Sequence, residues 1–171
     1  NDKAVFNRAY FVKPDGTWSQ YDKRHLFRMG NENRHYTKGE DKCIVEYKDV
    51  KFALNICYDI RFPVWSRNIG NKYDVLINIA NFPSVRIKAI EPLVRARAIE
   101  NMAYAIFVNR TGKDLTCEYS PSSQMYNFKG EPIQEEIYLK DCDGCNTQIS
   151  SCNVDTEELY DLCIWYDEFL T

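Results

Sequence analysis

The chain has 171 residues, of which 44% are hydrophobic and 27% charged, and its formal net charge is −3. This size fits one compact domain over residues 1–171, and this composition can bury a core, which excludes intrinsic disorder and a small disulfide scaffold. The acidic balance gives no basic surface for nucleic acid, and the longest apolar run, at 103–108, is too short to span a membrane, so neither is expected as a partner.

The first part of the chain predicts a β-hairpin followed by a long loop. Residues 6–13 have strand character, Pro14-Asp15-Gly16 is a turn sequence, and residues 18–23 form the returning strand. The segment 28–40 is polar, contains two glycines and lacks apolar periodicity, which is typical of a loop. Because long loops in compact domains often carry function, we expect part of a site there.

Strands and helices alternate through the central part of the chain. We expect strands at 43–47 and 50–57, a helix at 63–69, a strand at 74–80, a helix at 86–102 and a strand at 103–109. Strand–helix–strand units form parallel pairs, whereas the N-terminal hairpin is antiparallel, so the fold class should be α/β with a mixed sheet. The 86–102 helix should turn its arginines and glutamates away from the core, with Arg97 and Glu100 spaced for a scaffold ion pair.

The last third of the chain predicts a turn at 109–112, a hairpin from 122–127 and 132–138, a polar stretch at 140–153 and a final helix at 155–169. The odd number of cysteines, seven, favours reduced thiols in the cytoplasm over a closed set of disulfides. Four of these gather near the C-terminus: Cys142, Cys145, Cys152 and Cys163. The first two form a C-x-x-C pair that could begin a zinc site, but the other two are eleven residues apart, so we assign no metal and favour free thiols.

Cys57 stands at the end of the predicted strand 50–57. A cysteine on a sharp turn at the carboxyl end of a buried strand presents its sulfur where α/β folds place ligands. The peptide N–H groups that follow, that of Tyr58 first, would point into the same space and could stabilise a developing oxyanion. The structural alternative is a packed cysteine, because free cysteine is among the residues most often buried.

Lys23, at the end of the predicted hairpin, is the candidate partner of Cys57. A nearby ammonium lowers the pKa of a thiol and can also bond the oxyanion of a tetrahedral intermediate, so one cation could serve two steps. The alternative is an ordinary solvated lysine. The two histidines, His25 and His35, carry no catalytic signature, and we interpret His25, which is followed by apolar residues, as a hydrogen-bonded structural group.

Two aromatic residues and one arginine are candidates for the substrate pocket. Tyr58 and Phe82 follow neighbouring predicted strands, where a pocket wall and simple packing are equally consistent with their positions. Arg61 could bind a substrate carboxylate bidentately, or it could be tied to Asp59.

Three motifs in the chain resemble the nitrilase, or carbon–nitrogen hydrolase, superfamily: YDKRHLF at 21–27, CYDIRFP at 57–63 and RARAIEN at 95–101. They are most similar to the omega-amidase-like amidohydrolases. The resemblance implies an α-β-β-α sandwich and a Glu-Lys-Cys triad whose cysteine forms a thioester without any cofactor. Cys57 then matches the nucleophile and Lys23 the lysine. Glu32, seven residues before Gly39, matches a second glutamate that positions the lysine or the substrate.

The resemblance also implies a general-base glutamate in a region that precedes the hairpin. Residues 1–8 contain no such motif, so we expect an N-terminally truncated chain that holds the C-terminal two-thirds of the domain and needs the missing N-terminal segment as a partner. The family also implies a homodimer. With the base supplied, the expected function is hydrolysis of a small linear amide, such as the omega-amide of a 2-oxo acid. Without a base, the water that cleaves the thioester has no proton acceptor, and the alternative is a noncatalytic scaffold.

Overall fold

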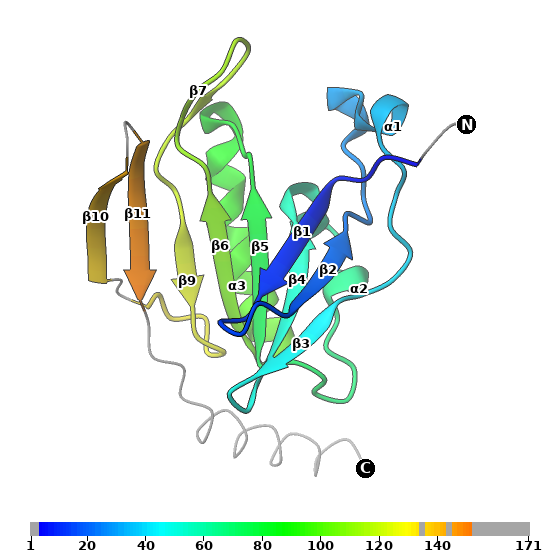
Figure 1. The fold of residues 1–171 in the computed structure, drawn as a ribbon. Helices are drawn as coiled ribbons and strands as arrows, with labels where there is room; N and C mark the ends of the chain where they lie inside the picture. Colours follow the sequence, from blue (N-terminus) through cyan, green and yellow to red (C-terminus); the bar gives the residue numbers. More distant parts are fainter. Residues whose placement is uncertain (1–3, 134–135, 143–144, 152–171) are drawn as a thin grey trace.

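The computed structural model describes residues 4–133, 136–142 and 145–151, and its centre is a five-stranded sheet in the order β3-β4-β5-β6-β9 (Figure 1). The strands of this sheet are β3 (Ile44–Tyr47), β4 (Val50–Ile56), β5 (Val75–Ala80), β6 (Tyr104–Asn109) and β9 (Gln124–Tyr126). The three central strands pair in parallel, and both edge strands are antiparallel to their neighbours. The predicted mixed sheet is therefore confirmed, and the carboxyl ends of β4, β5 and β6 meet at one edge.

Helices cover one face of this sheet. The first, α2 (Pro63–Ser66), is shorter than the predicted helix at 63–69, and proline occupies its first turn as expected. The second, α3 (Ile90–Asn101), follows the 3-10 helix η3 (Ser84–Ala89). Val94 and Ala98 of α3 are fully buried in the main apolar cluster, which also contains residues of β6. Burial of this apolar stripe fixes α3 against the sheet.

Arg97 departs from the prediction that the arginines of this helix face away from the core. Its side chain is only 4% exposed. The guanidinium donates to the backbone carbonyl of Ile60 through Nε (3.1 Å) and Nη2 (2.8 Å), and Nη1 forms the expected ion pair with Glu100 at 2.7 Å. A buried charge with these partners is compensated, so Arg97 ties α3 to the chain that follows β4.

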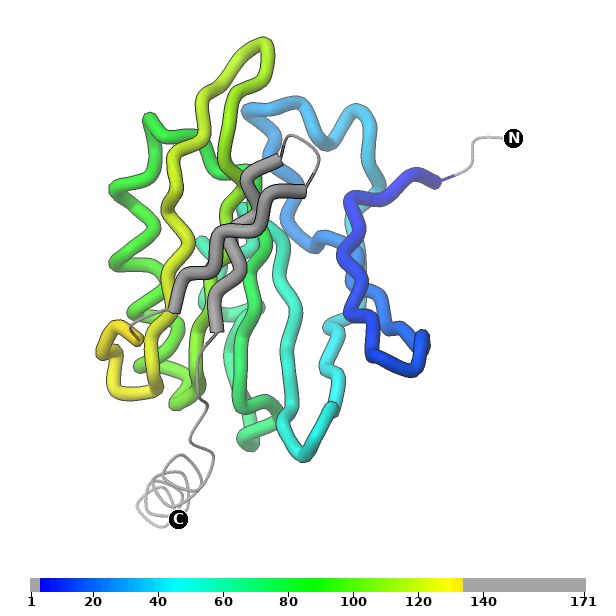
Figure 2. The backbone as a smooth tube through the Cα atoms, turned by 60° about the vertical axis from the view of Figure 1, so that its left-hand side comes forward, coloured from blue at the N-terminus to red at the C-terminus, as the bar shows by residue number. Residues whose placement is uncertain are grey.

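A hairpin of β1 (Arg8–Val12) and β2 (Trp18–Asp22) lies across the other face, so the sheet stands between this hairpin and α3 (Figures 1 and 2). Ala9 and Tyr21 of the hairpin are buried in a cluster with Leu54 and Ile56 of β4. This apolar contact fixes the end of β2 near the end of β4, where the sequence places its candidate residues.

The segment 28–40 is more ordered than the predicted loop. It contains the single-turn helices η1 (Arg28–Gly30) and α1 (Glu32–His35), separated by Asn31 in the left-handed conformation with φ 58°. One turn is too short to produce an apolar periodicity, which explains why the sequence did not reveal these helices. The N–H of Gly39 donates to the carbonyl of Lys23 at 2.9 Å and so ties the segment to the end of the hairpin.

The chain after β6 differs from the prediction in two places. A small hairpin of β7 (Gly112–Lys113) and β8 (Glu118–Tyr119) occurs where only a turn was expected. Within the described residues, the predicted pairing of 122–127 with 132–138 consists of a bridge between Tyr126 and Pro132 and a hydrogen bond from the N–H of Ile133 to the carbonyl of Met125 at 3.0 Å.

The polar stretch at 140–153 overlaps two strands that the sequence did not reveal. Here β10 (Glu136–Cys142) pairs in an antiparallel manner with β11 (Cys145–Ser151). The predicted helix at 155–169, Cys152 and Cys163 lie outside the described residues, as do the side chains of Cys142 and Cys145. Over the described part of the chain, no helix is both long and apolar enough to cross a bilayer.

Candidate active site

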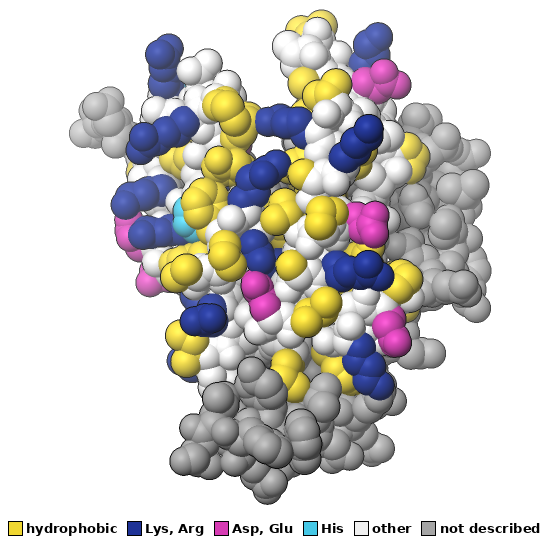
Figure 3. Space-filling model, turned by 180° about the vertical axis from the view of Figure 1, so that it is seen from behind, with side chains coloured by type: hydrophobic (Ala, Val, Ile, Leu, Met, Phe, Trp, Pro, Cys, Tyr) yellow, Lys and Arg dark blue, Asp and Glu magenta, His cyan; other side chains and the backbone are white. Residues whose placement is uncertain are grey.

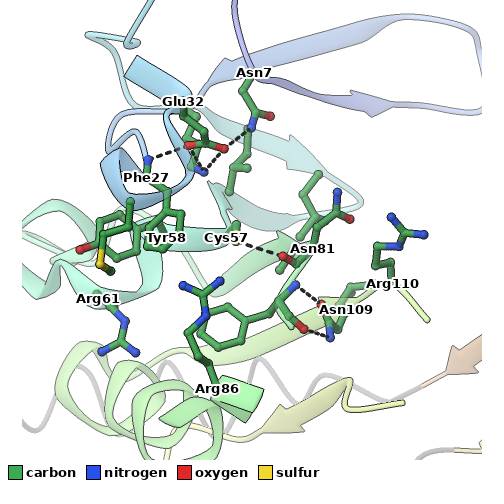
Figure 4. A pocket seen from close by; sticks show the side chains of 17 residues that line it. Asn7, Phe27, Glu32, Cys57, Tyr58, Arg61, Asn81, Arg86, Asn109 and Arg110 are labelled. Carbon is green, nitrogen blue, oxygen red and sulfur yellow. Dashed lines mark hydrogen bonds and ion pairs between the residues drawn. The ribbon is translucent and has the colours of Figure 1, made fainter. Parts of the chain in front are cut away.

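A cleft of ≈ 690 Å³ opens at the carboxyl edge of the sheet (Figure 4). Its walls come from the ends of β4, β5 and β6, from the chain around η1 and α1, and from the 3-10 helices η2 (Cys57–Arg61) and η3. The six residues that the sequence predicts for the site all line this cleft: Cys57, Lys23, Glu32, Tyr58, Arg61 and Phe82. The fold therefore brings together side chains from four separate segments.

Cys57 begins η2 directly after β4 and has a φ of 48°, in the left-handed region that non-glycine residues rarely adopt. Strained conformations of this kind recur at active sites, because they aim a side chain off the end of a strand. The S–H of Cys57 donates to the carbonyl of Asn81, with the two heavy atoms 3.9 Å apart. Burial raises the pKa of the thiol, and the ammonium of Lys23 is the main influence that lowers it. The two predicted partners therefore interact electrostatically.

Lys23 follows β2 and is only 1% exposed, so its positive charge is buried in the cleft wall. Its Nζ lies 2.9 Å and 2.7 Å from the two carboxylate oxygens of Glu32. Glu32 also accepts hydrogen bonds from the backbone N–H of Phe27 at 2.6 Å and from the side chain of Asn7 at 3.3 Å. These contacts neutralise the ammonium and fix its position. Figure 4 shows this group of bonds above Cys57.

Aromatic rings form part of the cleft wall. The ring of Tyr58 packs edge-to-face on Phe27, with centroids 5.0 Å apart, and on Phe62 at 5.3 Å. Phe82 is held through its backbone: its N–H donates to Asn109 Oδ1 at 2.7 Å, and Asn109 Nδ2 donates to its carbonyl at 2.9 Å. Tyr58 and Phe82 both line the cleft, and Phe82 is also buried in the main apolar cluster at 4% exposure, so it serves in packing as well as in the cleft wall.

Arg61 is exposed and lines the cleft, and the structure does not tie it to Asp59. The carboxylate of Asp59 is fully buried and accepts hydrogen bonds from Tyr21, His25 and Ile56 instead. In a 3-10 helix, residues two apart point in different directions, which separates Arg61 from Asp59. The Arg61 guanidinium is therefore available to the cleft.

Sequence reasoning missed Arg86, which η3 places in the cleft wall. Its guanidinium lies over the rings of Phe27 at 4.6 Å and Phe82 at 5.6 Å, and it points toward Cys57 in Figure 4. Within the described residues no carboxylate pairs with it. Lys and Arg side chains are spread over the upper part of the molecule in the view from behind (Figure 3). No sequence signal marked Arg86, because its position depends on where η3 packs.

Two asparagines at strand ends were also missed, although a simple signal marks them. Asn81 directly follows β5, and Asn109 is the last residue of β6. Both line the cleft. Polar residues at the carboxyl ends of parallel strands are expected near ligands, so this rule would have found them.

Comparison with known proteins identifies the family. The model of the carbon–nitrogen hydrolase family matches residues 1–141. The chain is 47% identical over 128 residues to omega-amidase YafV of Escherichia coli (strain K12), a match that covers 74% of the chain and 50% of that protein. It is 33% identical over 133 residues to 2-oxoglutaramate amidase of Bacillus subtilis (strain 168), a match that covers 77% of the chain and 51% of that protein. The chain thus spans about half the length of these relatives.

The similarity extends to a solved structure. XC1258 of Xanthomonas campestris, described as a CN-hydrolase superfamily protein, matches with a TM-score of 0.79 and 32% sequence identity, covering 99% of this chain and 64% of that one. The match of fold, the family model and the identity to curated relatives agree with one another, and they confirm the resemblance that the three motifs indicated. The chain therefore belongs to the carbon–nitrogen hydrolase family and has the α/β fold with a mixed sheet of the nitrilase superfamily.

Proposed function

We propose that this protein hydrolyses a small linear amide to a carboxylic acid and ammonia, with Cys57 as the nucleophile. The observation that carries the proposal is the placement of Cys57 on a left-handed turn in the same cleft as the buried ammonium of Lys23. The names of the relatives, omega-amidase and 2-oxoglutaramate amidase, support an amide of this class as the substrate.

In the proposed first step, the sulfur of Cys57 attacks the amide carbonyl carbon and forms a tetrahedral intermediate. The ammonium of Lys23 and the N–H of Tyr58, in the first turn of η2, stabilise the oxygen that becomes negative. The C–N bond then breaks as the nitrogen takes up the proton that the thiol gave to a proton acceptor. Ammonia leaves, and a thioester remains on Cys57. Water attacks this thioester, which releases the carboxylic acid and restores the thiol.

Both steps need a proton acceptor. Within the described residues, Glu32 is the one carboxylate that lines the cleft, and its oxygens already accept hydrogen bonds from Lys23, Phe27 and Asn7. We therefore assign Glu32 to holding Lys23. In this proposal the acceptor is the further glutamate that the family resemblance implies. A segment that does not belong to the described walls of the cleft would bring it.

The cleft also supports a substrate that carries a carboxylate. Arg86 and Arg61 both line it, and no carboxylate of the described chain pairs with either guanidinium. A guanidinium binds a carboxylate through two parallel hydrogen bonds, so an amide with an acid group at its other end would be held with its amide carbon toward Cys57. The omega-amide of a 2-oxo acid has this arrangement of groups.

The test uses the protein together with the segment that brings the proton acceptor. It measures ammonia release from a 2-oxo acid omega-amide, from succinamate and from the neutral butyramide, together with the intact mass of the protein. We expect faster release from the two acidic amides than from butyramide, and none from the Cys57→Ala variant. Equal release by Cys57→Ala would contradict the assignment of the nucleophile. A protein that releases no ammonia and gains no acyl mass on Cys57 would instead support the noncatalytic scaffold.

A further inference from the structure

Asp59 is a buried carboxylate next to the cleft that takes no direct part in the proposed reaction. Its side chain is 0% exposed and does not line the cleft. Oδ2 accepts hydrogen bonds from Tyr21 Oη at 2.8 Å and from the N–H of Ile56 at 3.0 Å. Oδ1 accepts the N–H of His25 at 2.9 Å, and Nδ1 of His25 lies 2.8 Å from it. Four donors compensate the burial of this charge.

These donors come from two segments that each carry a reactive side chain. Tyr21 and His25 stand two residues before and two residues after Lys23. Ile56 directly precedes Cys57, and Asp59 follows Cys57 by two residues. The first segment belongs to the hairpin sheet and the second to the five-stranded sheet, and no strand pairing joins these sheets in the described chain. Asp59 is therefore a polar link between the two segments.

The donors are themselves fixed in place. Burial, followed by the charge of Asp59, raises the pKa of Tyr21, so its hydroxyl keeps the proton that it donates. The same oxygen accepts a hydrogen bond from Trp65 Nε1 at 3.0 Å. The ring of His25 stacks on Phe62, with centroids 3.7 Å apart and planes 5° from parallel. This confirms the interpretation of His25 as a hydrogen-bonded structural group.

We propose that Asp59 is a positioning residue, which holds the segment of Lys23 against the turn of Cys57 and so keeps the ammonium where it acts on the sulfur. Both carboxylate oxygens take part in this link. Oδ2 bonds Tyr21 of the hairpin segment and Ile56 at the strand end, and Oδ1 adds a second bond to the hairpin segment through His25. The inference rests on the proposed function only in its choice of Cys57 and Lys23 as the reacting pair.

The test reads thiol chemistry and does not depend on amide turnover. Alkylation of the protein by iodoacetamide is followed over a range of pH, and the tryptic peptide of residues 52–61, in which Cys57 is the sole cysteine, is quantified by mass spectrometry. The main variant is Asp59→Asn, which keeps the shape of the side chain but replaces one carboxylate oxygen with an –NH₂ group, a donor that faces the donors of Tyr21, His25 or Ile56. The control is Asp74→Asn. Asp74 is also buried, at 2% exposure, and its carboxylate accepts the N–H of Lys51 at 2.7 Å. Asp74 directly precedes β5, so it lies at the edge of the sheet opposite the cleft.

We expect the midpoint of the alkylation profile to move to higher pH in Asp59→Asn, because a displaced Lys23 no longer favours the thiolate. Asp74→Asn should lower the melting temperature without moving the midpoint. Tyr21→Phe removes one donor and keeps the ring, so it should fold and move the midpoint in the same direction by less. If Asp59→Asn folds, a wild-type midpoint in both variants overturns the proposal. If Asp59→Asn does not fold, a wild-type midpoint in Tyr21→Phe overturns it. A shifted midpoint in a protein without ammonia release would contradict the proposed function only.

Discussion

At Cys57, burial and the nearby cations act in opposite directions on the pKa of the thiol. Burial is the stronger influence and raises the pKa, whereas Lys23 lowers it. At neutral pH the resting group is therefore a thiol. We predict that the alkylation rate of Cys57, measured on the 52–61 peptide, still rises as the pH passes about 8.5, the ordinary cysteine value, because only the thiolate reacts. A rate that has already levelled off below that pH would show that the cations outweigh burial.

Arg86 should determine the preference for an acidic amide. In Arg86→Met, KM for succinamate should rise about 10- to 100-fold, because a hydrogen bond to a charged group contributes about 1.5–3 kcal/mol. KM for butyramide should change little. Lys88→Met, an exposed position on the same 3-10 helix, is the matched control. An equal rise for both amides in Arg86→Met would show that Arg86 shapes the cleft without recognising the acid group.

At the scale of elements, Gly39 anchors the segment that carries Glu32. A Cβ at Gly39 would lie 2.1 Å from the backbone carbonyl oxygen of Asp22, which cannot move aside easily. We predict that Gly39→Ala displaces α1, lowers the free energy of unfolding by about 1–3 kcal/mol and slows alkylation of Cys57. Lys38→Ala, at the exposed neighbouring position, should have neither effect. Wild-type stability and alkylation in Gly39→Ala would show that the segment tolerates the displacement.

The middle of the sheet contains a buried amide whose polar atoms are not used by the described chain. Asn78 in β5 is 1% exposed, and within the described residues neither its Nδ2 nor its Oδ1 has a partner. We predict that Asn78→Leu raises the free energy of unfolding in urea by about 1–3 kcal/mol, because an unsatisfied buried group is removed. Asn55, its register partner in β4, donates to Ser66 Oγ at 2.8 Å, so Asn55→Leu should destabilise the protein. Equal destabilisation by both changes would contradict this view of Asn78.

The strands from β1 to β6 and the six cleft residues could be predicted from the sequence, because apolar runs and strand-end motifs are local signals. The burial of Arg97 could not be predicted from the sequence. The partner of its buried guanidinium is the carbonyl of Ile60, which is far away in the chain. The roles of Arg86 and Asp59 likewise depend on how η3 and the hairpin pack. Single turns such as η1 and α1 leave no periodicity to detect.

At the scale of the molecule, the candidate site exists only where two separate sheets meet. Lys23 directly follows β2 of the hairpin, and Cys57 directly follows β4. Apolar packing in the cluster of Tyr21 and Ile56 joins the two, without strand pairing in the described chain. A shift of the hairpin would separate the ammonium from the sulfur while leaving both sheets folded. Function in this account is therefore a property of the docked pair of sheets.

The central claim is that the charge of Lys23 acts directly on the sulfur of Cys57 across one cleft. The measurement that tests it is the pH profile of Cys57 alkylation in Lys23→Met, compared with the wild type and with Lys13→Met, a lysine on the same hairpin just after β1. We expect a midpoint at higher pH in Lys23→Met and an unchanged midpoint in Lys13→Met, because Lys23 is the main influence that lowers the pKa of this thiol. Identical profiles in all three proteins would contradict it.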